Sequence, residues 1–333
     1  PNDSIRYYKQ ILRSGLLSIE PESGHVKAWV GGINYKHFQY DAVKQQKRQV
    51  GSTFKPFVYA TAINQLNLSP CIKYPNTLYT IPKEKYGMPE DWTPKNATDD
   101  YGGELTLKEA LAGSVNVITA RLIDMVNPEN VVRLAHSAGI TTKIPEVPAI
   151  ALGSVDLSLY EMVGAYATFA NKGLQVEPMM ILKIEDKNGT ILQQFTPNSK
   201  EVLSEESAYV IINLLEGVTQ SGSGIRLRGK WGSYPDNVST GYPYEFTNPI
   251  AGKTGTTQNQ SDGWFMGIVP NLATGVWVGG EDRATHFAGI TFGQGATMAL
   301  PIWGLYYKKL YADPKLNVSI EEFDKPENLS IEI

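Results

Sequence analysis

The sequence predicts one α+β domain, in which an antiparallel β-sheet is flanked by helices and accompanied by an all-helical region. Strand patterns gather near both ends of the chain, at residues 16–30 and 250–279, and helix patterns occupy the middle. The 333 residues are 42% apolar and 19% charged, which is enough apolar sequence for a large core. We therefore expect the N-terminal strands to join the C-terminal strands in a single sheet.

The first predicted element is a β-hairpin. Residues 16–19 and 26–30 are apolar strand segments, and the sequence 21–24 between them is typical of a turn. An apolar helix pattern covers residues 54–63. Residues 64–105 are rich in Pro, Asn, Asp and Gly, so we expect them to be mostly irregular.

Capping signals mark three helices in the middle of the chain. In each, a polar side chain can accept the first free N–H groups, and a Glu or Pro follows where it favours a helix start. Gly139 is predicted to end the second helix. The capping residues are Thr106 with Glu109, Asn127 with Pro128, and Ser158 with Glu161.

The last third of the chain returns to strands. Before them we expect a hairpin turn at 187–189, a helix near 205–219 and a Gly- and Ser-rich loop over 220–248. The final elements are strands at 250–257, 263–269 and 274–279 and a helix around 297–311, with Leu300, Trp303 and Tyr307 on one face.

The predicted domain covers residues 14–311. Residues 1–13 are interpreted as a linker remnant, and residues 312–333 as an acidic, loosely held tail. No apolar run approaches the ~20 residues needed to cross a bilayer. Because Pro1 stands where an initiator methionine would, we expect an anchoring segment upstream of this chain.

Composition excludes several classes of function. The net charge of −4, with no extended basic run, argues against a nucleic-acid partner. Cys71 is the single cysteine, which rules out an internal disulfide framework and a cysteine-rich zinc site. The four histidines are scattered, with no His-x-x-x-His pair. We expect neither a metal nor an organic cofactor.

Three short motifs carry the predicted chemistry; each is weak alone, and the ordered set is strong. The first is Ser52-Thr53-Phe54-Lys55. At a helix start, Ser52 and Lys55 share one face, one turn apart, so the lysine can take the proton of the serine hydroxyl. Lysine has an ordinary pKa near ~10.4, so burial and a second cation must lower it. Lys253 is the candidate for that cation.

The second motif is Ser114-Val115-Asn116, in a short loop between helical segments. The Ser114 hydroxyl could pass a proton, and the Asn116 amide could hold a substrate carbonyl. Taken alone, Ser114 could equally cap a helix. The similar sequence 154–156 is rejected, because it runs into the Ser158 cap and ends in an aspartate, an uncompensated anion.

The third motif, Lys253-Thr254-Gly255, continues to Thr256 on a predicted strand. Lys253 and the two threonine hydroxyls could bind a terminal carboxylate. Gly255 could let a substrate backbone approach an edge strand. The three motifs together supply a nucleophile, a base, a relay and a cationic anchor, as in a serine acyl-transfer enzyme that works without histidine.

In this order the motifs resemble those of the penicillin-binding proteins and serine β-lactamases, and most closely the transpeptidase domain of class A, bifunctional penicillin-binding proteins. The resemblance extends from about Ser14 to Leu310. Val50 and Glu20 replace a proline and an aspartate usual in that family, away from the chemistry. Further matches lie at residues 19–32, 47–52, 105–116, 166–171 and 262–265.

The resemblance implies a D,D-transpeptidase. Ser52 would attack the D-Ala-D-Ala bond of a peptidoglycan stem peptide with Lys55 as base, while Ser114 relays the proton. Asn116 would orient the substrate. The terminal carboxylate would be bound by Lys253, Thr254, Gly255 and Thr256, and the oxyanion hole would be formed by the backbone N–H groups of Ser52 and Thr256.

The resemblance also implies partners and a location. An amine of a second stem peptide would accept the acyl group, and β-lactams would trap Ser52. The full-length protein would carry a glycosyltransferase domain and a membrane anchor upstream of this chain. It would act at the extracytoplasmic face of a bacterial membrane, in the periplasm or cell-wall space, within a cell-wall synthesis complex.

Three alternatives share the motifs. A D,D-carboxypeptidase differs only in using water as the acceptor. A class A β-lactamase adds a Glu-x-x-Leu-Asn pattern, which this sequence lacks after the second motif. A β-lactam sensor acylates without turnover and is joined to a transmembrane signalling segment.

Overall fold

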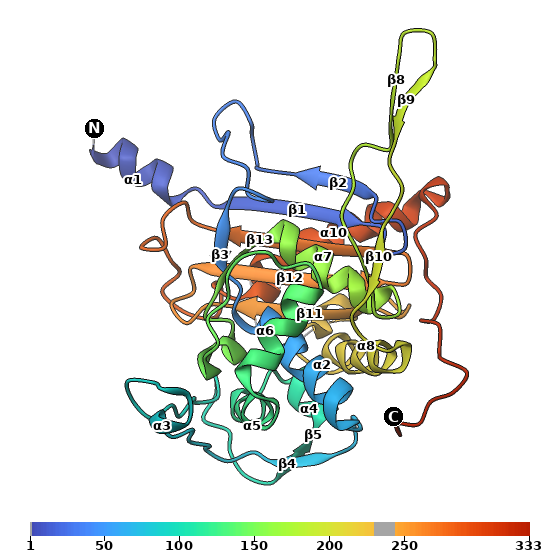
Figure 1. Cartoon of the computed structure of the whole chain (residues 1–333). Helices are drawn as coiled ribbons and strands as arrows, with labels where there is room; N and C mark the ends of the chain where they lie inside the picture. The colour runs from blue at the N-terminus through green and yellow to red at the C-terminus, as the bar shows by residue number, and fades with distance from the viewer. Residues whose placement is uncertain (1, 230–243) are drawn as a thin grey trace.

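The computed structural model describes residues 2–229 and 244–333. Its centre is a five-stranded antiparallel sheet with the order β11-β12-β13-β1-β2 (Figure 1). The predicted α+β fold is confirmed, since both ends of the chain contribute to this one sheet. Its strands are β1 (Arg13–Ile19), β2 (Val26–Val30), β11 (Ala251–Thr256), β12 (Asp262–Val269) and β13 (Leu272–Gly279).

Residue alternation gives the sheet two apolar faces, each covered by helices. The cross-strand row Leu16–Val276–Phe265 lies in the core under α10 (Leu300–Ala312). Leu17 and Met266, in the next row, belong to the larger core on the other face. That face is covered by α7 (Leu159–Ala170) and α8 (Glu205–Gln220), and α2 (Lys55–Leu66) packs against α8 (Figure 1).

A helical region contributes its buried side chains to the larger core and lies below the sheet in Figure 1. It contains α4 (Leu107–Ala112), α5 (Asn116–Val126) and α6 (Pro128–Ser137). The capping boxes predicted at Thr106 and Ser158 are both formed. Asn127 does precede Pro128 at a helix start, but the predicted side-chain cap is wrong. Its φ of 65° departs from the extended backbone of a capping residue, and its side chain makes no capping hydrogen bond.

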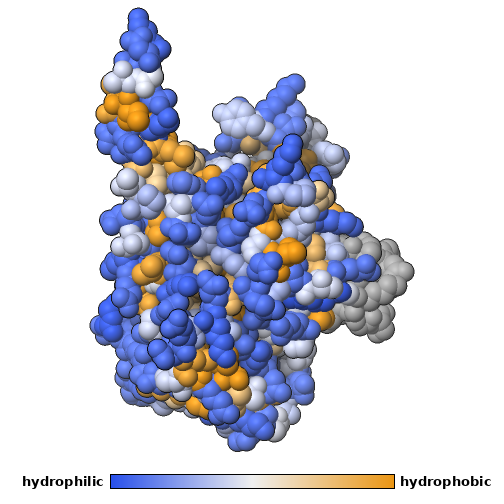
Figure 2. Space-filling model, turned by 90° about the vertical axis from the view of Figure 1, so that its right-hand side faces the viewer, coloured by the Kyte–Doolittle hydropathy of each residue, from blue (hydrophilic) through white to orange (hydrophobic). Residues whose placement is uncertain are grey.

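The remaining elements are short. The predicted hairpin at 187–189 is present, and Figure 2 shows it projecting with apolar side chains among polar ones. The single helix predicted at 297–311 is divided, because Pro301 begins a second helix. The paired strands are β3 (Lys47–Gln49) with β6 (Asp156–Ser158), β4 (Lys73–Pro75) with β5 (Glu104–Thr106), β7 (Leu174–Val176) with β10 (Ser199–Glu201), and β8 (Lys183–Glu185) with β9 (Ile191–Gln194). The other helices and turns are α1 (Asn2–Gln10), α3 (Lys83–Tyr86), α9 (Gly295–Met298), η1 (Gly51–Phe54), η2 (Pro148–Leu152), η3 (Ile225–Leu227) and η4 (Pro314–Leu316).

The C-terminal tail differs from the expectation of a loosely held segment. The Glu206 carboxylate on α8 accepts hydrogen bonds from the backbone N–H groups of Ser330 and Ile331, the latter at 2.8 Å. The Ile331 side chain is buried in the larger core. The tail is therefore fixed by burial of Ile331 and by a carboxylate that lies 124 and 125 residues before its two hydrogen-bond donors.

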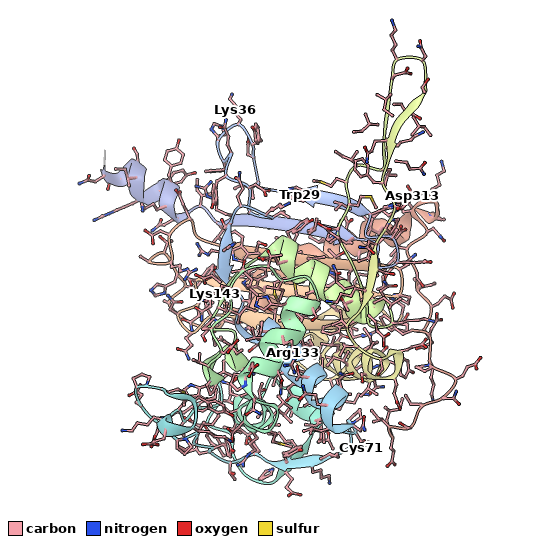
Figure 3. The ribbon with its side chains drawn as sticks, viewed as in Figure 1. Trp29, Lys36, Cys71, Arg133, Lys143 and Asp313 are labelled. Carbon is pink, nitrogen blue, oxygen red and sulfur yellow. The ribbon has the colours of Figure 1, made fainter. Side chains whose placement is uncertain are left out.

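Two sequence expectations concern surfaces. Cys71 is exposed and lies beside β4, at the lower end of the molecule (Figure 3). Within the described ranges, no helix combines the length and the apolar character that a bilayer crossing requires. Part of the loop predicted over 220–248, residues 230–243, lies outside the described residues.

Candidate active site

The three motifs converge between the sheet edge and the helical region. Ser52 lies in the 3₁₀ turn η1, which leads directly into α2 and Lys55. Ser114 lies in the loop that joins α4 to α5, and Lys253 lies on β11, the edge strand. The side chains of both lysines are fully buried, at 0% exposure. Two buried amines within one site are rare enough to indicate a functional arrangement.

Lys55 is surrounded by acceptor oxygens. Its Nζ donates to Asn116 Oδ1 at 2.6 Å and also to the backbone carbonyl of Ser114. The Ser114 hydroxyl lies 3.2 Å from the same nitrogen. Lys55 Nζ does not hydrogen-bond the Ser52 hydroxyl; the link between these two residues is the Lys55 N–H, which donates to the Ser52 carbonyl and sets their one-turn spacing.

Lys253 approaches the Ser114 hydroxyl from the other side. Its Nζ lies 2.9 Å from Ser114 Oγ and 3.2 Å from the carbonyl oxygen of Thr254. One hydroxyl therefore bridges two buried amines. Burial lowers the pKa of Lys253 to about 7. Burial, and then the nearby positive charge of Lys253, hold the pKa of Lys55 well below its ordinary value.

Ser114 has a backbone conformation that a helix cap would not require. Its φ of 56° lies in the left-handed region, and the N-cap of α5 is the next residue, Val115. Ser114 is therefore not the N-cap of α5, the other role that the sequence allowed. Instead the loop directs both the carbonyl and the hydroxyl of Ser114 toward the lysines.

The turn that carries Ser52 packs directly on β11. A Cβ on Gly51, whose φ is +54°, would lie 2.7 Å from the carbonyl oxygen of Thr256. A Cβ on Gly255 would lie 2.7 Å from the Val50 carbonyl oxygen and 2.8 Å from Thr53 Cγ2. The side of Gly255 on which a Cβ would lie is thus filled by the turn that carries Ser52.

Substitution of Gly51 by alanine is expected to separate Ser52 from the Thr256 backbone and to slow acylation on the order of 10- to 100-fold. Gly189→Ala is the matched control, because Gly189 also has a positive φ, of +84°, but has no atom within 4 Å of the added Cβ. Acylation by a fluorescent penicillin measures both. Equal rates in the two variants would show that contact with Thr256 is irrelevant.

Comparison with known proteins decides the family. The profile described as "Penicillin binding protein transpeptidase domain" matches residues 16–281. This chain belongs to the penicillin-binding protein transpeptidase family. It is 32% identical over 330 residues to penicillin-binding protein 1A of Aquifex aeolicus, covering 97% of this chain and 41% of that protein. It is 33% identical over 277 residues to penicillin-binding protein 2D of Bacillus subtilis, covering 82% and 38%.

Structural comparison agrees with the family assignment. A crystal structure of penicillin-binding protein 1A from Haemophilus influenzae superimposes with a TM-score of 0.80 and 26% identity, covering 95% of this chain and 49% of that chain. The chain therefore spans about two fifths of the length of the curated relatives named above. Its fold is that of a penicillin-binding transpeptidase domain.

Two threonines of the third motif already have partners within the protein. Thr254 Oγ1 lies 2.6 Å from Ser223 Oγ, and Thr256 Oγ1 accepts the N–H of Gly295 at 3.1 Å. Ser223 was not predicted from the sequence. It lies in the Gly- and Ser-rich loop after α8, where no spacing distinguishes it from its neighbours.

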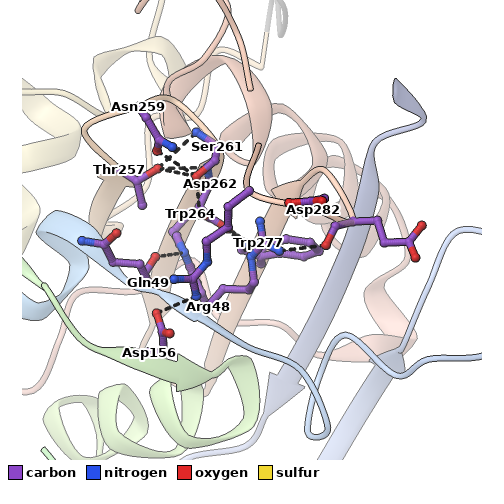
Figure 4. A network of polar contacts seen from close by, with 12 residues as sticks. Arg48, Gln49, Asp156, Thr257, Asn259, Ser261, Asp262, Trp264, Trp277 and Asp282 are labelled. Atoms are coloured by element: carbon purple, nitrogen blue, oxygen red, sulfur yellow. Dashed lines mark hydrogen bonds and ion pairs between the residues drawn. The ribbon is translucent and has the colours of Figure 1, made fainter. Parts of the chain in front are cut away.

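A buried ion pair supports the turn that carries Ser52 in this transpeptidase domain (Figure 4). Arg48 Nε lies 2.6 Å from Asp262 Oδ1, and Trp277 Nε1 donates to the same oxygen at 3.0 Å. Trp264 Nε1 also donates to the Gln49 carbonyl at 2.9 Å. These contacts join β3, which precedes Ser52, to β12, which pairs with β11. The rejected sequence 154–156 borders this cluster: Asp156 lies opposite Gln49 in the β3–β6 pair, and its carboxylate is paired with exposed Arg283 at 2.7 Å (Figure 4).

Proposed function

We propose that this chain is a D,D-transpeptidase domain that cross-links peptidoglycan stem peptides through an acyl-enzyme on Ser52. The observation that carries the proposal is the Ser114 hydroxyl between two buried lysines, 3.2 Å from Lys55 Nζ and 2.9 Å from Lys253 Nζ. Such an array can move a proton between a base and a leaving group without histidine.

In the acylation step, Lys55 is the base. A neutral lysine amine has two N–H donors and one lone pair, and here Asn116 Oδ1 and the Ser114 carbonyl accept the donors. The lone pair is then free to take the hydroxyl proton. Ser52 Oγ forms a bond to the carbonyl carbon of the penultimate D-Ala, and the carbonyl π electrons move to its oxygen. The proton passes to Lys55.

Collapse of the tetrahedral intermediate breaks the peptide bond and releases D-Ala. Its nitrogen leaves with the electron pair and takes a proton from Ser114, which is replenished from Lys55. The acceptor amine then reverses the sequence: it bonds to the acyl carbon and passes a proton through Ser114 to Lys55. The bond from the acyl carbon to Ser52 Oγ breaks, and Lys55 returns the proton to that oxygen. Lys253 keeps a positive charge beside this path and acts on the substrate carboxylate.

The substrate is held at the β11 edge. Lys253 with Thr254 and Thr256 binds the terminal carboxylate, and Gly255 contributes by allowing the nucleophile turn to pack here. The backbone N–H groups of Ser52 and Thr256 form the oxyanion hole. The close approach of the Gly51 backbone to the Thr256 peptide supports this assignment. A donor in such a hole contributes about 3–4 kcal/mol.

The proposal extends to the whole protein. β-Lactams would acylate Ser52 in place of the donor peptide. A glycosyltransferase domain and a membrane anchor would precede this chain and hold it at the extracytoplasmic face of a bacterial membrane, within a cell-wall synthesis complex. Support comes from relatives that are more than twice as long as this chain.

The test is product analysis with a donor stem peptide ending in D-Ala-D-Ala, alone and with excess acceptor amine. A transpeptidase joins the donor peptide, less its terminal D-Ala, to the acceptor amine in preference to forming the hydrolysed donor. Hydrolysis that added amine does not suppress would favour the carboxypeptidase alternative. Rapid turnover of benzylpenicillin would favour the β-lactamase, and a stable adduct with no action on the peptide would favour the sensor.

The pH dependence of acylation follows from the two lysines. Lys55 must be neutral, so the rate rises with pH as this group loses its proton. Lys253 must be charged to bind the substrate carboxylate. The second-order acylation rate constant, measured at low substrate concentration, therefore falls as pH rises through the Lys253 pKa of about 7. Lys253→Arg stays charged and is expected to retain its rate to about pH 9. The same alkaline fall in both proteins would contradict the role of Lys253.

A further inference from the structure

Helix α5 begins at Asn116 without a cap from its own sequence. The N-cap residue Val115 has no capping side chain, so the first N–H groups of the helix need another acceptor. Asn96 supplies it from twenty residues upstream: its Oδ1 accepts the N–H of Asn116 at 3.0 Å and that of Val117 at 3.3 Å. The cap of this active-site helix therefore comes from the irregular segment between β4 and β5.

The same segment fixes which way the Asn116 amide faces. Asn116 Nδ2 donates to the Lys95 carbonyl at 2.7 Å, and Asn116 Oδ1 accepts from Lys55 at 2.6 Å. If the amide were reversed, its oxygen would face the Lys95 carbonyl oxygen and its NH₂ group would face the Lys55 amine, so neither hydrogen bond could form. One N–H of the amide remains for a substrate carbonyl.

Asn96 is itself held on every polar atom of its side chain. Its Nδ2 donates to Asn76 Oδ1 at 2.9 Å and to the Asp100 carbonyl at 3.3 Å. Its backbone N–H donates to the Tyr101 hydroxyl oxygen at 3.0 Å. Asn76 is buried, at 6% exposure. These contacts fix the position of the Asn96 side chain relative to the start of α5.

We infer that Asn96 is a positioning residue for acyl transfer, acting through Asn116 on Lys55. This inference rests on the proposed function, because Asn96 would act on the orientation of Lys55, the proposed base. With Asn96 in place, the Asn116 oxygen occupies one N–H of neutral Lys55 and leaves the lone pair toward the hydroxyls. Without it, the start of α5 moves and the Lys55 amine can turn its lone pair away. Acylation then slows, while binding at β11 is unchanged.

Stopped-flow measurements with a chromogenic cephalosporin give two separate constants: the dissociation constant of the non-covalent complex and the rate constant of the acylation that follows. Asn96→Ala is expected to lower the rate constant about 10- to 100-fold and to change the dissociation constant by less than about threefold. Ser204→Ala, which removes the capping hydroxyl of α8, is the control for helix destabilisation and is expected to keep the wild-type rate constant.

A double-mutant cycle decides whether Asn96 acts through Asn116. In an Asn116→Ala background, Asn96→Ala is expected to cause no further loss. Equal losses in both backgrounds would overturn the inference, as would a wild-type rate constant in Asn96→Ala. Asn76→Ala removes one acceptor of Asn96 Nδ2 and repeats the test with a milder change, should Asn96→Ala not fold. If the wild-type chain itself is not acylated, the proposed function fails first.

Discussion

Lys55→Met is expected to slow acylation of Ser52 by benzylpenicillin on the order of 10³-fold or more. Methionine fills a similar volume but lacks the amine, and with it both the basic lone pair and the charge. The proton of Ser52 then has no acceptor, and the Ser114 carbonyl and Asn116 Oδ1 lose their donor. The second-order acylation rate constant, measured with excess drug, is the readout.

The control for this substitution is Lys47→Met. Lys47 is an exposed lysine on β3, in the strand that leads to the same turn. It is expected to keep acylation within about twofold of wild type, with both variants folded by circular dichroism. A rate constant for Lys55→Met within tenfold of wild type would assign the base to another group.

Asp262→Asn is expected to destabilise the fold by about 3–5 kcal/mol. The substitution leaves Arg48 as a buried charge without its counter-ion, because both side chains are almost completely buried, at 7% and 0% exposure. Trp277 can still donate to the new amide oxygen, so the loss is mainly electrostatic. Urea denaturation, followed by tryptophan fluorescence, measures the change in the free energy of unfolding.

Asp156→Asn is the matched control for that measurement. Its partner is Arg283 at 2.7 Å, and both side chains are about half exposed, at 46% and 43%. An exposed pair contributes about 0–1 kcal/mol. Adding Arg48→Met to Asp262→Asn is expected to recover part of the lost stability by removing the unpaired charge. Equal destabilisation by the two aspartate substitutions would contradict the importance of burial.

Much of the fold follows from local patterns in the sequence. Short apolar segments at both ends of the chain predicted the strands, and the sheet joins them as expected. The capping boxes at Thr106 and Ser158 form because all the required groups lie within one helical turn. The three motifs come together because each lies at the end of a predicted element or on an edge strand.

What the sequence did not predict depends on contacts between distant segments. Asn96 and Ser223 lie in irregular stretches, where no periodicity indicates which side chain points inward. Asn127 has the right residue type for a cap but the wrong backbone conformation. The close packing of the Ser52 turn on Gly255 likewise joins segments that are far apart in the sequence. Tertiary structure decides each of these cases.

The central claim is that Ser52 is the nucleophile of a slowly deacylating acyl-enzyme. Intact-mass spectrometry after brief exposure to benzylpenicillin tests it most directly, on the wild-type chain beside Ser52→Ala. The account predicts one long-lived adduct, with the full mass of the drug, on the wild-type protein only. An adduct on Ser52→Ala, or unmodified wild-type protein, would contradict it.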